Sequence, residues 1–564
     1  MFKYSFALWL AFSTLLAFSF EVESVPGEYV VKLKDGASLT SLQQFAEVQE
    51  VKAIPTRFGQ FAKIKMDSQF SEKSVSLLAK SAEIEYMEPN YIYRILGFEE
   101  KDYRPLKNLL AGRENSHRPV DPRFGELWGL ENTGENDRGN ALAGEDINAL
   151  QAWPLTMGSS AIKIAVIDTG IDYHHNDLHA NLWVNEDELN GTPGVDDDGN
   201  GVIDDIYGAR FIGGVASGDP MDGNGHGTHC AGTIGAVHNE IGVAGVMKDV
   251  EMVAVKFLSD SGSGSLDDAL SAINYALDLE VDIMSNSWGG GGFSQALFDA
   301  ISAANEAGIV FVAAAGNSSS NNDVRPMYPA TYQVDNVISV AAHHSGGALA
   351  SFSCFGPNTV HVAAPGQNIL STVQNNGYRS FSGTSMATPH VAGVVGLLLS
   401  TEPELSPLEI RDRLIRTSVE SDFLASRIVS GGRVDAYRAL TNERNVRELP
   451  HPDAWQELIL DEPFDMTNYA PNMDEVLNVS LPEGAAFVEF HFDEFNTEAN
   501  YDYFQVLTED GRVLWTLSGI NHGYTSPAIR VEGNIQLRFV SDHSVERSGF
   551  IIESIRVNDT IVVD

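Results

Sequence analysis

The chain has very few cysteines, with only Cys230 and Cys354 among its 564 residues. Two cysteines cannot build a disulfide framework, so stability has to come from packing, with bound metal ions as a further contribution. Positive charge is also scarce. Lys and Arg total 36 against 78 Asp and Glu, a formal net charge of −42. This excess argues against a nucleic-acid partner and favours solubility or cation binding.

Long apolar runs are absent beyond the first residues, so we expect no membrane span. Residues 1–19 carry one positive charge, a short apolar stretch and a small-residue end, which is typical of a cleavable secretion signal. We therefore expect a secreted, monomeric protein. Periplasmic or cell-surface retention is the alternative to full release.

The length predicts two to four domains. Residues 20–97 contain alternating strand patterns at 28–33 and 61–66, with helical stretches near 38–48 and 74–81, which indicates a small α+β unit. A polar stretch over residues 98–120 resembles a cleavable linker.

The pattern changes over residues 121–442, where short apolar runs alternate with helices. The expected strands are residues 162–167, 250–257, 281–284, 309–314 and 337–341. Such runs are typical of a parallel sheet buried on both faces, so we predict a doubly wound, mostly parallel α/β domain with its site at the carboxyl ends of the strands. After a linker at 443–459, alternating strands over 460–564 predict an all-β sandwich.

One serine lies where a nucleophile would. The segment Gly383-Thr384-Ser385-Met386-Ala387 begins a helix whose residues 391–399 are apolar on every face, so the helix should cross a core. At the start of that helix, the Ser385 hydroxyl lies beside unpaired N–H groups and the positive end of the helix dipole. The alternative is that these residues merely cap a core helix.

A serine nucleophile needs a base, and the base needs an orienting carboxylate. Asp168 follows the strand at 162–167, and His226 lies in a glycine-rich turn before a new helix. We predict that they form a triad with Ser385. His229 and His390 are more easily explained as structural histidines, and Asp172 as a residue that binds locally. Asn317, at the end of a buried strand, could donate to an oxyanion, although Asn after Gly is often only a turn former.

Four segments together resemble the signatures of subtilisin-like serine proteases. They are Ile167-Asp168-Thr169-Gly170, Gly225-His226-Gly227-Thr228-His229, Ala315-Gly316-Asn317 and Gly383-Thr384-Ser385-Met386-Ala387, in the order of that family. The resemblance implies Asp168, His226 and Ser385 as the triad, Asn317 as the oxyanion donor, and peptide-bond hydrolysis through an acyl-enzyme.

The resemblance also implies a substrate cleft. Two segments are similar to the backbone edges that clamp the peptide, with plain glycine connectors as the alternative: Ser261, Gly262, Ser263, Gly264, and Ser287, Trp288, Gly289, Gly290. Met327 is expected to floor the main specificity pocket. Residues 28–94 resemble the family's propeptide, a chaperone and inhibitor, and the tail Glu88-Pro89-Asn90-Tyr91 is expected to occupy the cleft.

Calcium is the expected cofactor. One acidic loop places oxygens at alternate positions around a glycine turn, at Asp196, Asp198, Asn200, Val202 and Asp205. Tyr207 stands where an EF-hand has its bidentate Glu, so the loop is closer to calcium insertions of some subtilases, or is only an acidic turn. A second site is implied by the resemblance alone, at Asp177, Val237, Asn239, Ile241 and Val243.

The last segment contains Phe495-Asn496-Thr497-Glu498, Tyr501-Asp502-Tyr503, and Phe539-Val540-Ser541-Asp542 through Gly549-Phe550. On these residues it resembles a CUB domain. In calcium-binding members, the equivalents of Glu498, Asp502 and Asp542 hold the ion and help to engage an extracellular ligand. A sandwich acting as a spacer or secretion aid is the alternative.

Taken together, the sequence predicts a secreted, calcium-stabilised serine endopeptidase made as a self-processed zymogen. It should act on protein or peptide substrates, with its own propeptide as inhibitor. The competing interpretation is an adhesion or matrix-binding protein with a vestigial protease domain.

Overall fold

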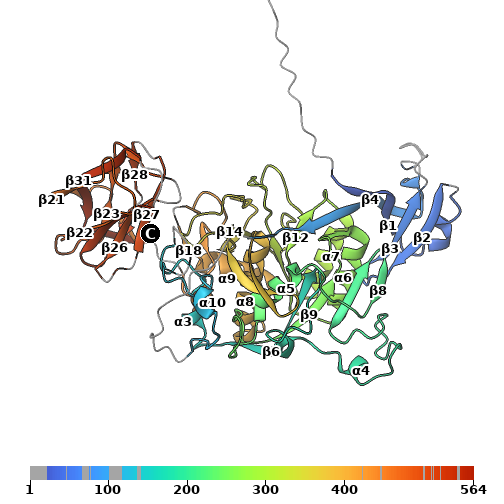
Figure 1. Ribbon diagram of the computed structural model, residues 1–564. Helices are drawn as coiled ribbons and strands as arrows, with labels where there is room; N and C mark the ends of the chain where they lie inside the picture. The colour runs from blue at the N-terminus through green and yellow to red at the C-terminus, as the bar shows by residue number, and fades with distance from the viewer. Residues whose placement is uncertain are drawn as a thin grey trace, which may run out of the picture.

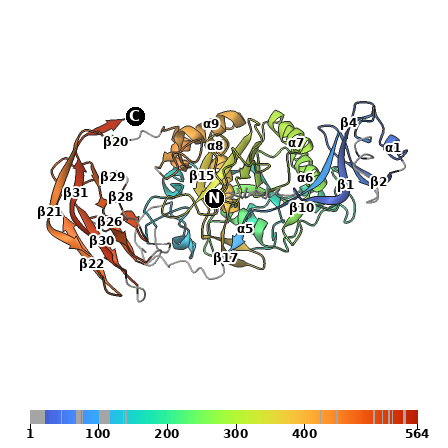
Figure 2. The same cartoon turned by 90° about the horizontal axis from the view of Figure 1, so that it is seen from above.

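The computed structural model describes residues 22–563 except 46, 67–74, 76, 77, 101–116, 136, 138–140, 422, 445–447, 499–501, 510, 512, 521, 522, 527 and 543–546. The expected signal at 1–19 and most of the expected linker at 98–120 lie outside these residues. Three bodies follow one another in a row: a small N-terminal domain, a central α/β domain and a C-terminal β domain (Figures 1 and 2).

The N-terminal domain is an antiparallel sheet of order β4-β1-β3-β2. Its strands are β1 (Ser24–Leu33), β2 (Val48–Ile54), β3 (Gln60–Met66) and β4 (Ile84–Ile95). Alternation along β1 gives the sheet two apolar faces, because Val31 packs into the domain's own core and Val30 packs against the central domain. The helix expected near 38–48 is only one turn long, α1 (Leu39–Leu42), and part of the stretch expected at 74–81 lies outside the described residues.

The central domain confirms the predicted doubly wound sheet. Ten strands run in the order β18-β19-β15-β14-β13-β11-β6-β9-β7-β8, parallel except at the two edge strands β18 and β8. The strands are β6 (Gly158–Asp168), β7 (Gly208–Ile212), β8 (Val215–Ser217), β9 (Asp249–Lys256), β11 (Ile283–Asn286), β13 (Val310–Ala314), β14 (Val337–His343), β15 (Val362–Pro365), β18 (Val419–Glu420) and β19 (Gly432–Arg433).

Helices cover both faces of this sheet, so its strands are buried on both sides. Along β6, Ile164 and Val166 belong to one core and Ala165 and Ile167 to the other. The first core is closed by α5 (His226–Gly235) and α8 (Thr384–Thr401), the second by α6 (Leu266–Asp278) and α7 (Gln295–Glu306). The α8 helix is buried from Thr384 through Leu399 because it runs through the interior.

Shorter elements complete the central domain. They are β5 (Phe98–Glu99), η1 (Phe124–Glu126), α3 (Ala149–Ala152), η2 (His179–Asn181), α4 (Glu186–Leu189), β10 (Ser263–Ser265), β12 (Trp288–Gly290), β16 (Ile369–Val373), β17 (Gly377–Ser382), α9 (Pro407–Thr417) and α10 (Ala436–Thr441). Among the helices that the structure describes, none is both long and apolar enough to cross a membrane.

The C-terminal domain is a sandwich of two antiparallel sheets, β21-β31-β23-β29 and β22-β30-β26-β27. Its core is rich in aromatic side chains, including Phe490, Phe504, Trp515, Phe539 and Phe550. Two strands begin inside the expected linker at 443–459, because Glu448–Pro450 pairs with the last strand and Trp455–Asp465 forms an edge of the sandwich.

The strands of this domain are β20 (Glu448–Pro450), β21 (Trp455–Asp465), β22 (Asp474–Val479), β23 (Phe487–Glu489), β24 (His491–Phe492), β25 (Phe495–Asn496), β26 (Tyr503–Thr508), β27 (Val513–Leu517), β28 (Tyr524–Thr525), β29 (Ile529–Arg530), β30 (Ile535–Val540), β31 (Gly549–Asn558) and β32 (Ile561–Val563).

The N-terminal domain is fastened to the central domain at two helix N-termini. The Glu88 carboxylate accepts hydrogen bonds from Ser294 Oγ (2.6 Å) and from the backbone N–H groups of Gln295 (2.9 Å) and Ala296 (3.1 Å) at the start of α7. Asn90 Oδ1 accepts from the N–H of Asp267 in the first turn of α6 (3.1 Å). Both contacts satisfy donors that a helix leaves unpaired.

Replacing the Glu88 carboxylate should loosen this attachment. Removing a cap of this kind costs about 0.5–2 kcal/mol, so Glu88→Ala should raise amide hydrogen exchange over residues 92–95 of the intact chain about two- to thirtyfold. Glu50→Gln, an exposed acid on β2, serves as the control and should leave exchange unchanged. Equal exchange in all three proteins would show that Glu88 does not hold the domain.

Candidate active site

Three residues from separate elements lie at the carboxyl edge of the central sheet. Asp168 ends β6, His226 begins α5, and Ser385 is the second residue of α8. His226 Nδ1 lies 2.8 Å from Asp168 Oδ1, and both side chains are buried. The backbone N–H of Thr169 also donates to Asp168 Oδ1 (2.7 Å). This carboxylate is therefore fixed in place to orient the imidazole.

The chain itself passes through this site. The carbonyl oxygen of Leu96 accepts hydrogen bonds from the backbone N–H of Ser385 (3.1 Å) and from Asn317 Nδ2 (2.6 Å). Asn317 is oriented by Thr384, whose N–H and hydroxyl both donate to Asn317 Oδ1 at 2.9 Å. Two donors thus converge on one carbonyl beside a serine, which is the geometry that stabilises an oxyanion.

Gly383 permits this close approach. A Cβ added at residue 383 would lie 2.3 Å from Leu96 O and 2.7 Å from Gly97 Cα, and its φ of 153° is one that other residues rarely adopt. Only glycine leaves room for the bound chain at the start of α8.

The hydroxyl of Ser385 donates to the carbonyl of Ser287 (2.7 Å) in this structure. His226 Nε2 is buried and has no hydrogen-bond partner among the described residues. Gly97 lies directly against this nitrogen, because a Cβ at residue 97 would be 2.8 Å from His226 Nε2 and 3.1 Å from Met386 Sδ. The nitrogen therefore faces the peptide bond that follows Leu96.

The bound segment is clamped as a strand between two edges of the central domain. β4 pairs antiparallel with β10, with Gly264 opposite Tyr93, and with β12, with Gly289 opposite Arg94. The N–H of Ile95 donates to Gly262 O (3.0 Å), and that of Leu96 to Ser287 O (3.2 Å). These are main-chain contacts, as the glycine-rich segments suggested. Ser261 is exposed and bonds instead to neighbouring serines.

The prediction that residues 88–91 fill the cleft is wrong by several positions. Glu88 and Asn90 lie on the two helix N-termini described above, and residues 92–96 occupy the cleft. The sequence pattern places the cleft segment too early in the chain, because the capping residues and most of the cleft residues lie on one continuous strand, β4.

Two apolar pockets hold the bound chain. A Cβ added to Gly289 would lie 2.9 Å from Leu96 Cδ1 and 3.2 Å from Met327 Sδ, so Leu96 and Met327 share one pocket. Tyr93 is fully buried, and its ring stands 5.2 Å from the Trp288 ring, edge to face. Phe257 packs on the other side of Trp288 at 4.8 Å.

Other titratable residues near the triad are engaged elsewhere. His229 Nε2 lies 2.9 Å from the Ile369 carbonyl, and burial lowers its pKa to about 3. His390 Nδ1 lies 2.8 Å from the Met386 carbonyl, and burial lowers its pKa to about 4. Asp172 accepts from the N–H of Asn375 (2.7 Å). Burial raises the pKa of the Cys230 thiol, which keeps it protonated and inert.

The acidic loop is organised, and it recruits a residue that the sequence pattern missed. Carboxylate oxygens of Glu188, Asp196 and Asp198 lie within 4.8 Å of one another. Glu188 comes from α4 and also accepts from the N–H groups of Asp197 (2.7 Å) and Asp204 (3.0 Å). It stands outside the loop pattern, so only the fold brings it in.

One predicted ligand of this loop is engaged elsewhere. Asp205 is buried, bonds to Asn185, Asn200 and Tyr275, and is not part of the carboxylate group. Burial raises the pKa of Asp205 to about 6. The Val202 side chain packs into the second core, and its backbone carbonyl stays a predicted ligand.

The second predicted group gathers around Asp177. Asn239 Nδ2 donates to Asp177 Oδ1 (2.8 Å), the N–H of Val243 donates to Asp177 Oδ2 (3.0 Å), and the N–H of Val237 to the Asp177 carbonyl (2.8 Å). Ile241 N–H donates to Asn239 Oδ1 (2.6 Å).

Asp121 joins this group from far away in the sequence. Its Oδ1 accepts from the Asn239 N–H (3.0 Å), and its Oδ2 is buried without a partner among the described residues. Burial and the nearby Asp177 raise the pKa of Asp121 to about 6. A second carboxylate beside an unsatisfied oxygen fits an oxygen-ligated cation.

The C-terminal domain has its own carboxylate group. Oxygens of Glu498, Asp502 and Asp542 lie within 4.8 Å of one another. Tyr469 donates its hydroxyl to Asp502, and Glu498 Oε2 is buried without a partner among the described residues. Hard oxygen donors with one unsatisfied atom fit Ca²⁺.

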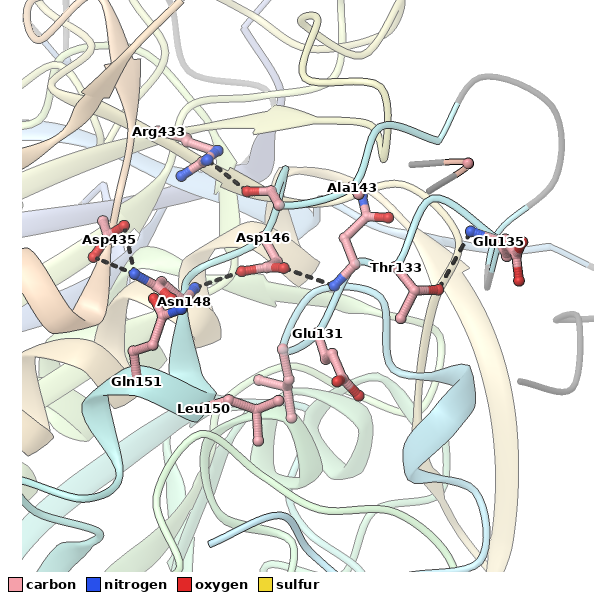
Figure 3. Close-up of a pocket in the computed structure, with 14 residues that line it drawn as sticks. Glu131, Thr133, Glu135, Ala143, Asp146, Asn148, Leu150, Gln151, Arg433 and Asp435 are labelled. Carbon is pink, nitrogen blue, oxygen red and sulfur yellow. Dashed lines mark hydrogen bonds between the residues drawn. The ribbon is translucent and has the colours of Figure 1, made fainter. Parts of the chain in front are cut away.

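A separate polar pocket of about 510 Å³ lies between the central domain and Gly511 of the C-terminal domain (Figure 3). Two of its carboxylates are already bonded within the protein: Asp146 accepts from the N–H groups of Asn132 (2.6 Å) and Asn148 (2.7 Å), and Asp435 accepts from the N–H of Arg438 (2.8 Å). Burial raises the pKa of Asp146 to about 6. None of the residues predicted for the active site lines it.

Comparison with known proteins identifies the class. The subtilase family model matches residues 159–448, just over half of the chain, and the CUB domain model matches residues 459–553. The chain therefore belongs to the subtilase family, whose members are serine endopeptidases, and carries a CUB domain after its peptidase domain.

Individual relatives agree with this assignment. The chain is 34% identical over 369 residues to subtilisin-like protease 1 of Plasmodium berghei (strain Anka), covering 62% of this chain and 59% of the relative. It is 37% identical over 310 residues to subtilisin-like protease 1 of Plasmodium vivax, covering 52% and 49%. Subtilisin DY of Bacillus licheniformis is 41% identical over 258 residues, which are 46% of this chain and 83% of that protein. The chain thus spans about half the length of the Plasmodium relatives.

Asn317→Ala should cripple catalysis while leaving the fold intact, because it removes one of the two donors to the Leu96 carbonyl. The corresponding loss in subtilisin is on the order of 10²–10³ in kcat, and we expect the same range in peptide hydrolysis with KM little changed. Ser318→Ala is the matched control, since its hydroxyl contacts only Ser320 and Cys354 in the hydrogen bonds of the described residues. A loss that appears in KM alone would contradict this role for Asn317.

Proposed function

We propose that this protein is a serine endopeptidase that works through an acyl-enzyme, with Asp168, His226 and Ser385 as the triad and Asn317 as oxyanion donor. One observation carries the proposal. The Leu96 carbonyl is held by Ser385 N–H and Asn317 Nδ2 in a cleft that also contains the bonded Asp168–His226 pair.

The chemistry follows from these positions. The Ser385 hydroxyl turns from the Ser287 carbonyl toward His226 Nε2, gives up its proton there and attacks the carbonyl carbon. Negative charge then develops on the oxygen held by the two donors. His226 Nε2, which faces Gly97, passes the proton to the departing amine, and water releases the acyl group by the reverse steps.

We further propose that the chain's first substrate is itself, at the bond between Leu96 and Gly97. The segment from residue 20 to residue 96 would then remain as an inhibitor, held by strand pairing and by the two helix contacts until it is removed. Backbone clamping with apolar pockets for Tyr93 and Leu96 favours protein and peptide substrates that can bind as extended strands.

Labelling with a fluorophosphonate tests the activity directly. Purified wild-type protein should label on Ser385 and hydrolyse casein, and Ser385→Ala should do neither. In subtilisin, loss of this serine costs on the order of a million-fold in kcat. Absence of labelling in the processed wild-type protein would favour the alternative of a binding protein with a vestigial protease domain.

Gly97→Ala should slow self-processing. The added methyl would meet His226 Nε2 at 2.8 Å and Met386 Sδ at 3.1 Å, so the peptide must shift away from the catalytic groups. Such a misplacement costs on the order of tenfold or more, and Gly97→Val should be slower still. Time courses of precursor loss on gels measure this effect. Maturation of Gly97→Ala at the wild-type rate would exclude cleavage at this bond.

We propose that Ca²⁺ stabilises the protein at three places. Glu188, Asp196 and Asp198 would hold one ion, Asp121 and Asp177 a second together with the 237–243 segment, and Glu498, Asp502 and Asp542 a third. When bound, the ion neutralises carboxylates that are crowded together in the folded state. We also propose that the protein is secreted, and that its CUB domain engages an extracellular ligand.

Chelation should lower thermal stability. A site filled at 100 times its Kd contributes about 2.7 kcal/mol. With an unfolding entropy of about 2.1 cal/mol/K per residue, this corresponds to roughly 4 °C in Tm for the large peptidase domain and roughly 12 °C for the smaller CUB domain. Differential scanning fluorimetry with EDTA or excess CaCl₂ measures the shift. Asp121→Asn should shrink the shift of the peptidase domain, and Asp542→Asn that of the CUB domain. An unchanged Tm in EDTA would contradict all three assignments.

A further inference from the structure

The cleft continues past the bond between Leu96 and Gly97. There β5 (Phe98–Glu99) pairs antiparallel with β17 (Gly377–Ser382), with Phe98 opposite Ser382 and Glu99 opposite Phe381. The N–H of Glu100 extends the pairing by donating to the Ser380 carbonyl (2.8 Å). Residues on the far side of the bond are therefore bound in a defined register.

This register places the side chain of Arg379 beside that of Glu99. Arg379 lies two residues before Phe381 in β17, so its side chain is a diagonal neighbour of Glu99, within reach of a long side chain. Arg379 Nη1 lies 3.1 Å from Glu99 Oε2. Among the ion pairs of the described residues, Arg379 has no acidic partner other than Glu99. Without the bound segment, its charge would face the cleft unpaired.

The backbone around Arg379 is rigid. β17 is paired along its other edge with β16, where Ser371 stands opposite Arg379. The Arg379 carbonyl lies 3.1 Å from His229 Nε2, and the His229 ring stacks on Phe381 at 4.5 Å. The strand then leads directly into Ser385. The position of the Arg379 backbone relative to the nucleophile is thus set by the fold.

We propose that Arg379 makes this cleft select an acidic residue at the third position after the cleaved bond. This inference rests on the proposed peptidase activity and names a preference of the same cleft. A protein whose formal net charge is −42 repels acidic peptides overall. A single arginine on the primed side would offset that repulsion at one position and distinguish between substrates with equal unprimed residues.

The size of the expected preference for an acidic residue follows from the solvent exposure of the Arg379–Glu99 pair. The side chains of Arg379 and Glu99 are 57% and 32% exposed. Pairs this open to water are weak and are screened by salt, so we expect about a two- to fivefold preference in kcat/KM. That is enough to rank peptides but too little to stop cleavage of neutral ones.

Internally quenched peptides with the sequence Tyr-Arg-Ile-Leu-Gly-Phe-X-Ala test the proposal on the mature enzyme. X is Glu, Gln or Lys, and the readout is kcat/KM at low salt and in 1 M NaCl. Wild type should rank Glu above Gln above Lys, with the ranking lost in high salt. Arg379→Gln should flatten the ranking, and Arg379→Glu should reverse it to favour Lys.

Lys248→Gln is the control, because it removes the same charge from an exposed residue just before β9, at the opposite edge of the sheet. It should leave the ranking unchanged. If wild type cleaves all three peptides equally at low salt while Ser385→Ala cleaves none, the proposal for Arg379 fails and the peptidase function stands. If wild type cleaves none of them, the proposed function itself fails.

Discussion

The geometry of the candidate active site centres on one backbone carbonyl group that is held in place. Leu96 O lies between the N–H of Ser385 and the amide of Asn317, and strand pairing on both sides of the bond keeps it there. Because the donors are fixed by α8 and by the end of β13, they would need no rearrangement in the proposed reaction, in which negative charge develops on that oxygen. The sheet, the buried helix and the glycine at residue 383 all serve this geometry.

The N-terminal domain reaches this position through many weak contacts and a few charged ones. Lys63 Nζ lies 2.7 Å from Asp267, and Lys32 Nζ lies 2.7 Å from Asp299. Each pair joins a basic residue of the first domain to a carboxylate of the acidic central domain. Together with the caps on α6 and α7, they align β4 so that its end meets the triad. We therefore propose that the same domain guides the chain into the cleft and blocks it.

Much of the fold and of the candidate site could be predicted from the sequence, because short and specific motifs mark both. Asp168, His226 and Ser385 lie in short signatures whose glycines permit close backbone approach. The short apolar runs predict the parallel sheet. The position of the cleft segment could not be predicted, since residues 88–95 lie in one strand with no internal marker between its capping part and its cleft part.

The site residues that the sequence does not reveal were missed for one physical reason: they are brought together only by folding. Asp121 and Glu188 lie outside every local pattern, and only the folded chain brings them beside Asp177 and the acidic loop. Arg379 and Glu99 are 280 residues apart and become neighbours through antiparallel pairing. Contacts between distant segments depend on register, and one residue of slip would reverse which side chains meet.

Sequencing the N-terminus of the mature enzyme, with the intact mass of the released fragment, is the most direct measurement. If Leu96 is the residue held for attack, the mature chain of the first cut begins at Gly97 and the fragment ends at Leu96. A first cut after any residue of the 88–91 segment, or the same cut in Ser385→Ala protein free of other proteases, would contradict the arrangement described.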